Sequence, residues 1–234
     1  GGMSVSVPLT PYLTSAAQTV NSMVFTHASV WLLGFLGIVA FAWMARVREK
    51  DRFVLQEQLA HDALHDVLTD LPNRTLFTDR LNTAIRRQQR DPDYQFAICF
   101  LDLDRFKNLN DSYGHKLGDE MLKQVAERFS EITRPMDTVA RMGGDEFTFL
   151  LENYADDKEA VLIIDRLLAT LEQPFDIAGT PMYTNASIGV CFGDYDYKRA
   201  DDMIRDADIA MYQAKSSGKG QVYIFDPHMH RQAV

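Results

Sequence analysis

The sequence has little cysteine and no excess of positive charge, and each shortage excludes a class of protein. Two cysteines in 234 residues are too few for a disulfide-stapled fold. Cys99 and Cys191 both lie in apolar runs and are interpreted as core residues of strands, a disulfide or metal pair being the alternative. The formal net charge of −9 argues against a broad nucleic-acid-binding face. A nucleotide substrate remains compatible, because bound metal ions can supply positive charge locally.

Charged residues are also missing from a near-continuous apolar run near the N-terminus, from Val24 to Ala45. A bilayer core of ~30 Å needs about 20 such residues, so we predict a transmembrane helix over residues 23–45. Trp31 and Trp43 would lie toward the two interfaces. A cleaved signal peptide is the first alternative, disfavoured because no small-residue cleavage site follows the run. A buried core helix is the second, disfavoured by the length.

Positive charge is distributed unevenly around this run. Arg46, Arg48, Lys50 and Arg52 follow it at once, whereas no Lys or Arg precedes it. Because positively charged flanks stay on the cytoplasmic side, everything after Arg46 is predicted to be cytoplasmic. We therefore expect a single-pass protein of the inner (cytoplasmic) membrane, with its catalytic domain in the cytoplasm.

The remaining segments follow from composition. Gly1 and Gly2 are interpreted as residues left by cloning, at the head of an N-terminal segment 1–22. Residues 46–65 lack Gly and Pro and predict a helical connector. A narrow seam of Val54 (or Leu55), Leu59 and Leu64 would let it pair with a second copy. Residues 66–226 form the main domain, and 227–234 a tail.

Within residues 66–226, strand and helix patterns alternate. Helices are predicted from a cap at Asn73 to about Arg90 and over 117–132, 160–171 and 200–214, and strands over 96–102, 138–141, 147–151, 182–190 and 222–225. The strands 138–141 and 147–151 flank a Gly-Gly turn and read as a hairpin. This order predicts an α+β fold, a mostly antiparallel central sheet flanked by helices.

Two acidic elements carry the chemistry. Asp102 and Asp104 stand at the end of the apolar strand; residues two apart face the same way on a strand, but if the strand has ended Asp104 turns away. Carboxylates at such a place commonly hold Mg²⁺. An EF-hand loop is excluded, because Phe106 and Lys107 occupy positions that need a ligand and a glycine.

The second acidic element is the turn Gly143-Gly144-Asp145-Glu146-Phe147. Gly143 and Gly144 allow positive φ and let a ligand approach the backbone closely. Asp145 and Glu146 would project from the tip. Carboxylates from two separate elements are what two-metal phosphoryl transfer needs.

This turn resembles the signature of the GGDEF family, the diguanylate cyclases, which make cyclic di-GMP from two GTP. Three further stretches resemble the family's motifs in the family's order, so the resemblance covers about residues 66–225. They are Asp66–Arg74, Asp102–Asp119 and Asp206–Gly220. The resemblance implies a GGDEF domain with a nucleotidyl-cyclase, palm-like fold, typical of bacterial signalling.

The resemblance also implies roles for single residues. Asp102, Asp145 and Glu146, with the carbonyl of Leu103, would bind Mg²⁺ (or Mn²⁺), and Glu146 would bind the second ion or activate the attacking 3′-hydroxyl. Asn110 and Asp119 would read the guanine. The remaining contacts would meet phosphate oxygens: the side chains of Lys107, Lys215 and Lys219 and main-chain N–H groups near Arg105 and Phe106.

Taken singly, several of these residues have ordinary structural explanations. Asp119 could be an acid near a helix start, Asn110 could hold a turn, and Lys215 and Lys219 could be cations at a helix C-terminus. The family often has Arg where this chain has Lys219, and Lys lacks the bidentate fork. Weaker phosphate binding is expected there rather than loss of activity.

Arg134-Pro-Met-Asp137 lies just before the signature and resembles the family's inhibitory site, where Arg and Asp grip a product dimer. The alternative is an ion pair in a helix–strand loop. The functional interpretation predicts inhibition by cyclic di-GMP, the product.

The family mechanism places one GTP on each domain, so activity would require a homodimer. A binding module that keeps GTP or cyclic di-GMP without chemistry, and regulates an attached domain, is the alternative from another class. A related metal-dependent cyclase or a polymerase palm is a third, disfavoured by Asn110 and Asp119 as a guanine pair and by the lack of a basic template-binding face in the sequence. The ending Phe225–Val234 resembles domains that continue into a phosphodiesterase, so we expect a fragment of a longer protein.

Overall fold

The computed structural model describes residues 10–231 and divides into two compact units, Gly1–Leu59 and Ala60–Val234. The predicted N-terminal segment 1–22 falls partly outside the described residues. Each unit is treated by itself below.

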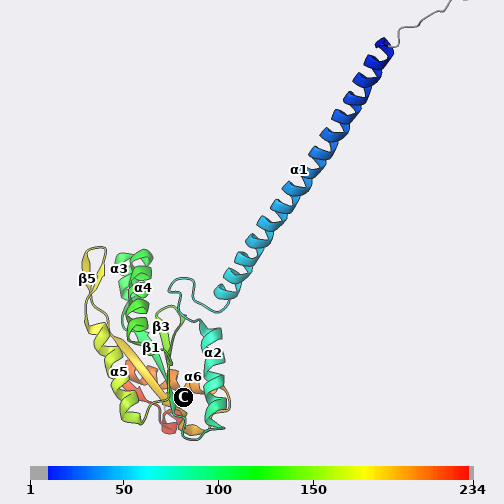
Figure 1. Ribbon diagram of the computed structural model, residues 1–234. Helices are drawn as coiled ribbons and strands as arrows, with labels where there is room; N and C mark the ends of the chain where they lie inside the picture. Colours follow the sequence, from blue (N-terminus) through cyan, green and yellow to red (C-terminus); the bar gives the residue numbers. More distant parts are fainter. Residues whose placement is uncertain (1–9, 232–234) are drawn as a thin grey trace, which may run out of the picture. The chain divides into compact units, whose positions relative to one another are not determined.

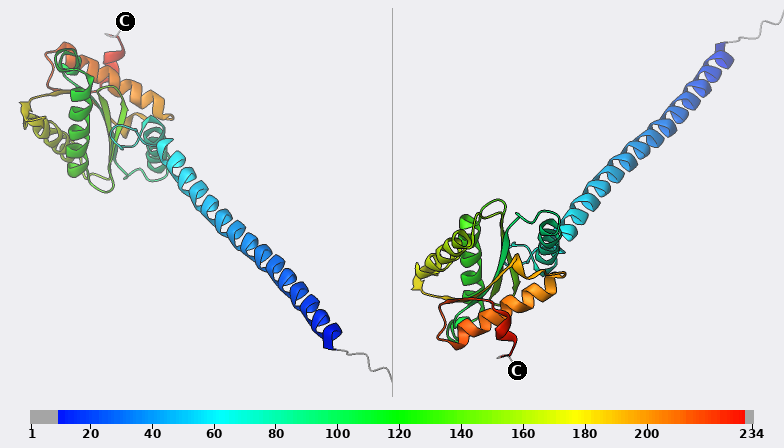
Figure 2. Two further views of the ribbon diagram at one scale, coloured as in Figure 1. Left: turned by 90° about the horizontal axis from the view of Figure 1, so that it is seen from above. Right: turned by 90° about the horizontal axis from the view of Figure 1, so that it is seen from below.

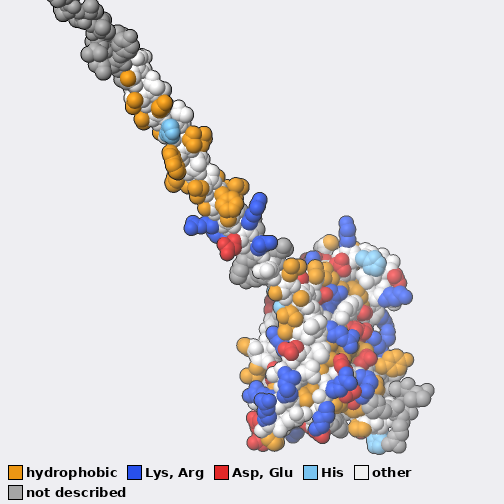
Figure 3. Space-filling view, turned by 90° about the vertical axis from the view of Figure 1, so that its right-hand side faces the viewer, with side chains coloured by type: hydrophobic (Ala, Val, Ile, Leu, Met, Phe, Trp, Pro, Cys, Tyr) orange, Lys and Arg blue, Asp and Glu red, His pale blue; other side chains and the backbone are white. Residues whose placement is uncertain are grey.

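The first unit is helical. Helix α1 (Thr10–Asp62) is one long element that includes the predicted transmembrane segment and runs on through nearly all of the predicted connector. Among the described residues, one stretch, Gln18–Lys50, is long and apolar enough to cross a membrane, with a mean hydropathy of 2.0; signal sequences near an N-terminus meet the same criterion. Figure 3 shows its hydrophobic side chains followed by Lys and Arg. In the predicted seam, the side chains of Val54 and Leu55 lie outside the described residues.

The second unit is built on a five-stranded sheet in the order β2-β3-β1-β6-β7. Its strands are β1 (Phe96–Leu103), β2 (Thr138–Gly143), β3 (Glu146–Glu152), β6 (Ala186–Phe192) and β7 (Val222–Ile224). The first four pair antiparallel and β7 joins β6 in parallel, so the predicted mostly antiparallel sheet is confirmed. The apolar strand predicted over 96–102 is central and buried along its whole length.

Helices cover both faces of this sheet (Figures 1 and 2). Successive residues of a strand face opposite sides. Phe96, Ile98 and Phe100 pack with α2 (Arg74–Gln88) and α6 (Ala200–Ser216). The alternate residues of β1 pack with α4 (His115–Ile132) and α5 (Asp157–Glu172). A strand that is buried on both sides accounts for the continuous apolar run in the sequence.

Close packing of α6 on the sheet needs a glycine in β6. A Cβ on Gly189 would lie 2.0 Å from the carbonyl oxygen of Ala207 and 2.2 Å from the nitrogen of Met211. Any side chain would therefore push α6 away. This close contact sets the distance between α6 and the sheet, and with it the position of Lys215, in the last turn of α6, near the end of β1.

Three local predictions need correction. The single strand predicted over 182–190 is divided: Met182 ends β5 (Thr180–Met182), which pairs with β4 (Phe175–Ile177) in a separate hairpin, and β6 starts at Ala186. The helix from Asn73 ends at Gln88 rather than Arg90, with Asn73 capping it as predicted. A short helix α3 (Phe106–Tyr113), which was not predicted, follows β1.

Candidate active site

Two carboxylates face each other where β1 and β3 end. Asp102 lies opposite Glu146 in the antiparallel register, and opposite Ser187 of β6 on its other side. Directly opposed residues in an antiparallel pair have Cβ atoms about 5 Å apart on the same face. The predicted juxtaposition of the strand-end acid and the hairpin acid is therefore found, on the face that α6 covers.

Lys215, at the last turn of α6, joins this pair. Its Nζ lies 2.7 Å from Oδ2 of Asp102, whose side chain is 12% exposed. Burial raises the pKa of Asp102; the Lys215 hydrogen bond lowers it, and the charge of Asp145 raises it further. Burial also raises the pKa of Glu146, and the charges of Asp208 and Asp102 add to the effect. Acids crowded in this way favour a bound cation.

Asp208 was not predicted to belong to the site. Burial raises its pKa, while the charges of Lys215 and Arg74 lower it. Lys215 also acts on Asp102 and Glu146, so all three acids surround the same lysine. Asp208 and Lys215 are seven residues apart in α6 and lie on one helix face. That spacing is readable in the sequence, but only the packing of α6 on the sheet brings Asp208 near Glu146.

The turn between β2 and β3 owes its shape to two glycines. Gly143 has φ of 138° and Gly144 of 54°, in the region that favours residues without a Cβ, and the strand register shifts between Arg141 and Gly143. The carbonyl of Asp145 accepts a hydrogen bond of 3.2 Å from the nitrogen of Leu103. The turn is thereby fastened to the end of β1.

The buried side chain of Arg141 makes hydrogen bonds to the same turn. Arg141 donates from Nε (3.1 Å) and Nη2 (2.7 Å) to the carbonyl of Gly144, and from Nη1 (2.7 Å) to Oδ1 of Asp66. Burial alone would raise the pKa of Asp66, but hydrogen bonds from Thr69 and Arg141 outweigh it and hold that pKa below its ordinary value. Asp66, at the start of the domain, is thus tied to the Gly143-Gly144 turn, an arrangement that sequence reasoning missed.

Asp104 turns away from Asp102, the second of the two possibilities left open by the sequence. Its Oδ1 accepts from the hydroxyl of Ser187 (2.9 Å) and its Oδ2 from the nitrogen of Gly220 (2.8 Å). Strand β1 ends at Leu103, which removes the two-residue alternation. Asp104 therefore links β1, β6 and the loop after α6.

The predicted guanine readers lie on adjacent helices. Asn110 is on α3 and Asp119 on α4, beside Gly118. A Cβ on Gly118 would lie 1.8 Å from Oδ1 of Asn110, so the amide rests directly on the glycine backbone. That Oδ1 is buried and, among the described residues, has no hydrogen-bond partner. A buried acceptor without a donor is costly unless a ligand supplies one.

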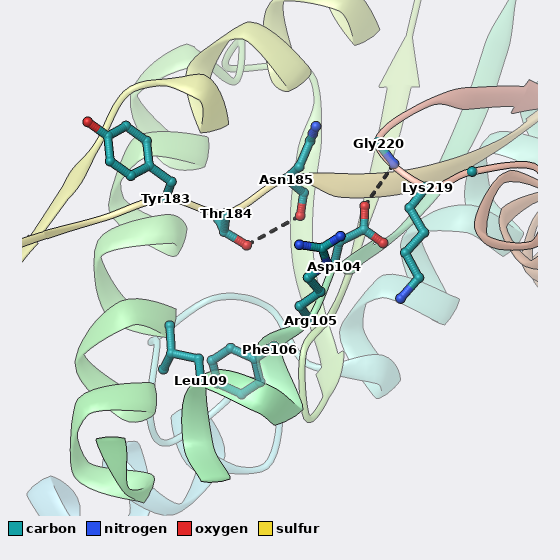
Figure 4. A pocket seen from close by; sticks show the side chains of 10 residues that line it. Asp104, Arg105, Phe106, Leu109, Tyr183, Thr184, Asn185, Lys219 and Gly220 are labelled. Carbon is teal, nitrogen blue, oxygen red and sulfur yellow. Dashed lines mark hydrogen bonds between the residues drawn. The ribbon is translucent and has the colours of Figure 1, made fainter. Parts of the chain in front are cut away.

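A cavity of about 400 Å³ lies beside the loop from β1 to α3 (Figure 4). Three predicted substrate residues line it: Arg105, Phe106 and Lys219. Tyr183, Thr184 and Asn185, which carried no prediction, form another wall. Lys107 is exposed in the first turn of α3.

The predicted inhibitory pair lies apart from this site. Asp137 precedes β2, so about 20 Å of strand separates it from the Gly-Gly turn at the other end. Arg134 donates from Nε to Oδ2 of Asp137 at 2.8 Å and from Nη1 to Glu159 at 3.2 Å. Oδ1 of Asp137 accepts from the nitrogen of Glu152 at 3.0 Å. In this state the two residues form a loop ion pair.

The donor set suits a magnesium ion. Among the described residues, no three His, Cys, Asp or Glu side chains form a ready-made metal cage. Mg²⁺ does not need one, because it usually takes one or two protein carboxylates, waters and substrate phosphates. The crowded acids at the end of β1 match that requirement.

Comparison with known proteins agrees with this geometry. Residues 63–221 match the family described as diguanylate cyclase, GGDEF domain. The chain is 42% identical over 176 residues to the bifunctional diguanylate cyclase/cyclic di-GMP phosphodiesterase MucR of Pseudomonas aeruginosa, a match over 75% of this chain and 25% of MucR. It is 38% identical over 180 residues to the diguanylate cyclase TpbB of the same species, over 76% of this chain and 40% of TpbB. The chain thus spans less than half the length of these relatives.

Solved structures are similar as well. The isolated GGDEF domain of TpbB matches with a TM-score of 0.69 and 36% identity, covering 72% of this chain and 98% of that domain. The GGDEF domain of DgcB from Caulobacter crescentus, solved with cyclic di-GMP, matches with a TM-score of 0.63 and 25% identity, over 69% of this chain and 95% of that domain. The chain therefore belongs to the GGDEF family of diguanylate cyclases.

Proposed function

We propose that this chain condenses two GTP molecules into cyclic di-GMP and two pyrophosphates. The observation that carries the proposal is the pair of opposed acids, Asp102 and Glu146, packed at the sheet edge beside Lys215. A buried acidic cluster with one lysine suits a nucleotide triphosphate with its metal ions. The relatives MucR and TpbB, both named as diguanylate cyclases, support the same activity.

Asp102, Asp145, Glu146 and the carbonyl of Leu103 would hold Mg²⁺ (or Mn²⁺). Bound there, the metal would neutralise charge on the phosphates and align the attacking oxygen. Lys215 would have a separate role: its ammonium group, which lies 2.7 Å from Oδ2 of Asp102, would bind a phosphate oxygen. Glu146, with its raised pKa, is the candidate to accept the proton of the 3′-hydroxyl.

Asn110 and Asp119 would select guanine. The buried, unpartnered Oδ1 of Asn110 can accept a hydrogen bond from the base. Asp119 is an exposed carboxylate one residue from Gly118, on which that amide rests. A carboxylate accepts from both the ring N–H and the amino group of guanine. Adenine offers no such paired donors at that edge, so GTP would be preferred to ATP.

Each 3′-hydroxyl must attack the α-phosphate of the other GTP, so we propose that two chains face each other in the active form. In the proposed organisation, residues 23–45 cross the inner membrane, 46–65 connect and pair, and 66–226 form the cytoplasmic catalytic domain. The four cations from Arg46 to Arg52 support this orientation.

Arg134 and Asp137 are proposed to bind the product, cyclic di-GMP, and so to limit synthesis. To bind guanine, Asp137 would exchange its bond with Arg134 for bonds to the base, while the Glu152 nitrogen keeps one oxygen in place. Arg134→Ala is expected to abolish inhibition by added product and leave the initial rate unchanged. Inhibition of equal strength in this variant would remove the proposal.

The alternative is a module that binds GTP or cyclic di-GMP and regulates an attached domain without chemistry. It is favoured by the relative NbdA of Pseudomonas aeruginosa, 33% identical over 220 residues, which is named as a cyclic di-GMP phosphodiesterase alone. Both acids of the turn are present in this chain, which favours the catalytic proposal.

The deciding experiment incubates the full chain in detergent with Mg²⁺ and either GTP or ATP, and separates the products by chromatography. Cyclic di-GMP from GTP alone, lost in Asp145→Ala and kept in the exposed-loop control Asp93→Ala, is the expected result. Tight GTP or cyclic di-GMP binding without any product, even in chains forced to dimerise, would favour the binding module.

A further inference from the structure

Two histidines and an aspartate meet where helix α1 ends. His61 lies in the last turn of α1 and His65 four residues later, and both belong to the compact unit Ala60–Val234. Their imidazole rings are stacked, with centroids 3.9 Å apart and planes 2° from parallel. Nε2 of His61 lies 3.6 Å from Oδ1 of Asp70, in the loop that leads to α2. The proposed cyclase site uses none of these three side chains.

The distance between His61 and Asp70 suits two ligands of one metal ion better than a direct bond. At 3.6 Å the nitrogen and the oxygen are too far apart for a hydrogen bond. As an ion pair they would gain little, because the two side chains are 48% and 84% exposed. Two ligands that each lie about 2.1 Å from a tetrahedral Zn²⁺ are separated by roughly 3.4 Å. The observed separation is close to that value.

The contacts of His65 leave one of its ring nitrogens available to a metal. Nδ1 of His65 lies 3.0 Å from the carbonyl oxygen of His61, and since a carbonyl only accepts, this nitrogen carries a proton. Nε2 of the neutral ring then presents a lone pair. Histidines that bind metals commonly have this arrangement, in which the second nitrogen donates to a carbonyl or a carboxylate.

Asp70 occupies a backbone conformation that glycine adopts more easily. Its φ is 61°, in the left-handed region that few residues with a Cβ enter, although aspartate tolerates it. The loop imposes this conformation through two bonds of 2.8 Å, from the nitrogen of Asp70 to the carbonyl of Asp66 and from the nitrogen of Asp66 to the carbonyl of Leu71. A carboxylate therefore stands at the end of α1 where the backbone alone would favour glycine.

Backbone hydrogen bonds also fix the histidines relative to this loop. The carbonyl of His61 accepts from the nitrogens of Leu64 and His65, both at 2.9 Å, and the nitrogen of Asn73 donates to the carbonyl of Leu64 at 2.9 Å. The parallel rings direct their lone pairs side by side, so no closed cage is found among the described residues. Turning the half-exposed ring of His61 about its side-chain bonds would bring the donor atoms together, with the backbone already in place.

We propose that His61, His65 and Asp70 bind a divalent transition-metal ion, for which Zn²⁺ is the best match. Imidazole nitrogens and a carboxylate oxygen are ordinary zinc ligands, and water completes the four-coordinate shell where the protein supplies three. Mg²⁺ is a poor match, because it prefers oxygen ligands in octahedral geometry. This site is separate from the proposed magnesium site, and the inference does not depend on cyclase activity.

The bound ion would join the last turn of α1 to the loop before α2. That loop is already bonded to the Gly143-Gly144 turn, because Arg141 contacts both Asp66 and the carbonyl of Gly144. Zn²⁺ would therefore stabilise the segment that connects the end of the helix with this turn, and raise the Tm of the domain.

The test titrates Zn²⁺ calorimetrically into the full chain in detergent, with excess Mg²⁺ present to occupy the acids of the sheet edge. We expect one saturable site per chain. His61→Ala and His65→Ala should each weaken binding about a hundredfold or more, since loss of a residue behind a ligand already costs about 10–100-fold. Asp70→Gly removes the carboxylate where the backbone suits glycine, so it should weaken binding about tenfold without lowering Tm in metal-free buffer. The control His115→Ala, at the exposed start of α4, should change neither.

Co²⁺ gives a second readout, because its visible absorption is intense in tetrahedral sites and weak in octahedral ones. Intense bands in the wild type that disappear in His61→Ala would support the assigned ligands. The absence of saturable Zn²⁺ binding in the wild type would overturn the inference, as would unchanged binding in His61→Ala and His65→Ala. Unchanged binding in Asp70→Gly would overturn the three-ligand site. Thermal melting in metal-free buffer identifies any variant that loses binding because it fails to fold, and His61→Gln then replaces His61→Ala.

Discussion

The contact of Arg141 with Asp66 and Gly144 gives the sharpest stability prediction. Arg141→Ala removes a buried guanidinium, 9% exposed, that makes two bonds to the Gly144 carbonyl and one to Asp66. Hydrogen bonds to charged groups contribute about 1.5–3 kcal/mol, and breaking a fully buried ion pair costs about 3–5 kcal/mol. Because the Asp66 side chain is 23% exposed, the lower end of the ion-pair range applies. We therefore expect Arg141→Ala to lower the free energy of unfolding by about 3 kcal/mol.

A double-mutant cycle isolates the ion pair. Arg141→Ala, Asp66→Asn and the double variant are compared by pulse proteolysis in urea, which follows survival of the domain in the full chain. A coupling energy of about 1–2 kcal/mol is expected for residues in direct contact. The control Arg80→Ala removes a single bond, to the hydroxyl of Thr138, and should cost about 1 kcal/mol or less. If the stability losses of the two single variants add up to that of the double variant within about 0.5 kcal/mol, the two side chains are not coupled and the predicted ion-pair contribution is wrong.

Three further predictions concern the site. Gly118→Ala places a methyl group against Oδ1 of Asn110 and should raise KM for GTP about tenfold in steady-state assays without lowering Tm, since Ala favours helices; an unchanged KM would contradict the proposed position of the base. The lowered pKa of Asp66 stabilises the fold above the ordinary value of 3.8, and this contribution is lost as pH falls through the lowered pKa. The free energy of unfolding, measured in urea between about pH 6 and pH 3, should therefore fall more for the wild type than for Asp66→Asn. Parallel dependence on pH in the two proteins would contradict this prediction. Removal of metal by EDTA should abolish cyclic di-GMP synthesis and added Mg²⁺ should restore it, and turnover that survives EDTA would exclude the proposed metal role of Asp102.

The sequence predicted the sheet and the acids because both depend on local patterns. The run Phe96–Asp102 is apolar on both faces and ends in a carboxylate, and Gly143-Gly144 marks a hairpin. The hairpin fixes the register of β2 with β3. The pairing of β1 with β3, which places Asp102 opposite Glu146, joins strands distant in the sequence and is a tertiary contact that these local patterns do not specify.

The features that were not predicted depend on tertiary contacts or have weak patterns in the sequence. Arg141 and Asp66 are 75 residues apart and carry no mutual pattern. Helix α3 has only 8 residues, fewer than the window of about 11–18 over which helical periodicity can be recognised. The β4–β5 hairpin turns at Ala178-Gly179, with φ of 52° and 81°, and Ala is not a residue that announces such a turn. Apolar alternation across Met182 and Ala186 then concealed the break between β5 and β6.

In the proposed function, each chain supplies half of a cyclase that joins two GTP molecules. The most direct test mixes a fixed amount of wild-type chain with increasing amounts of Asp145→Ala, allows the subunits to exchange in detergent, and measures cyclic di-GMP. We expect synthesis by the wild type alone and about half the yield per wild-type chain at equal mixing, because half of its partners are then inactive. No cyclic di-GMP from the wild type, or a yield that the inactive chain does not change, would contradict it.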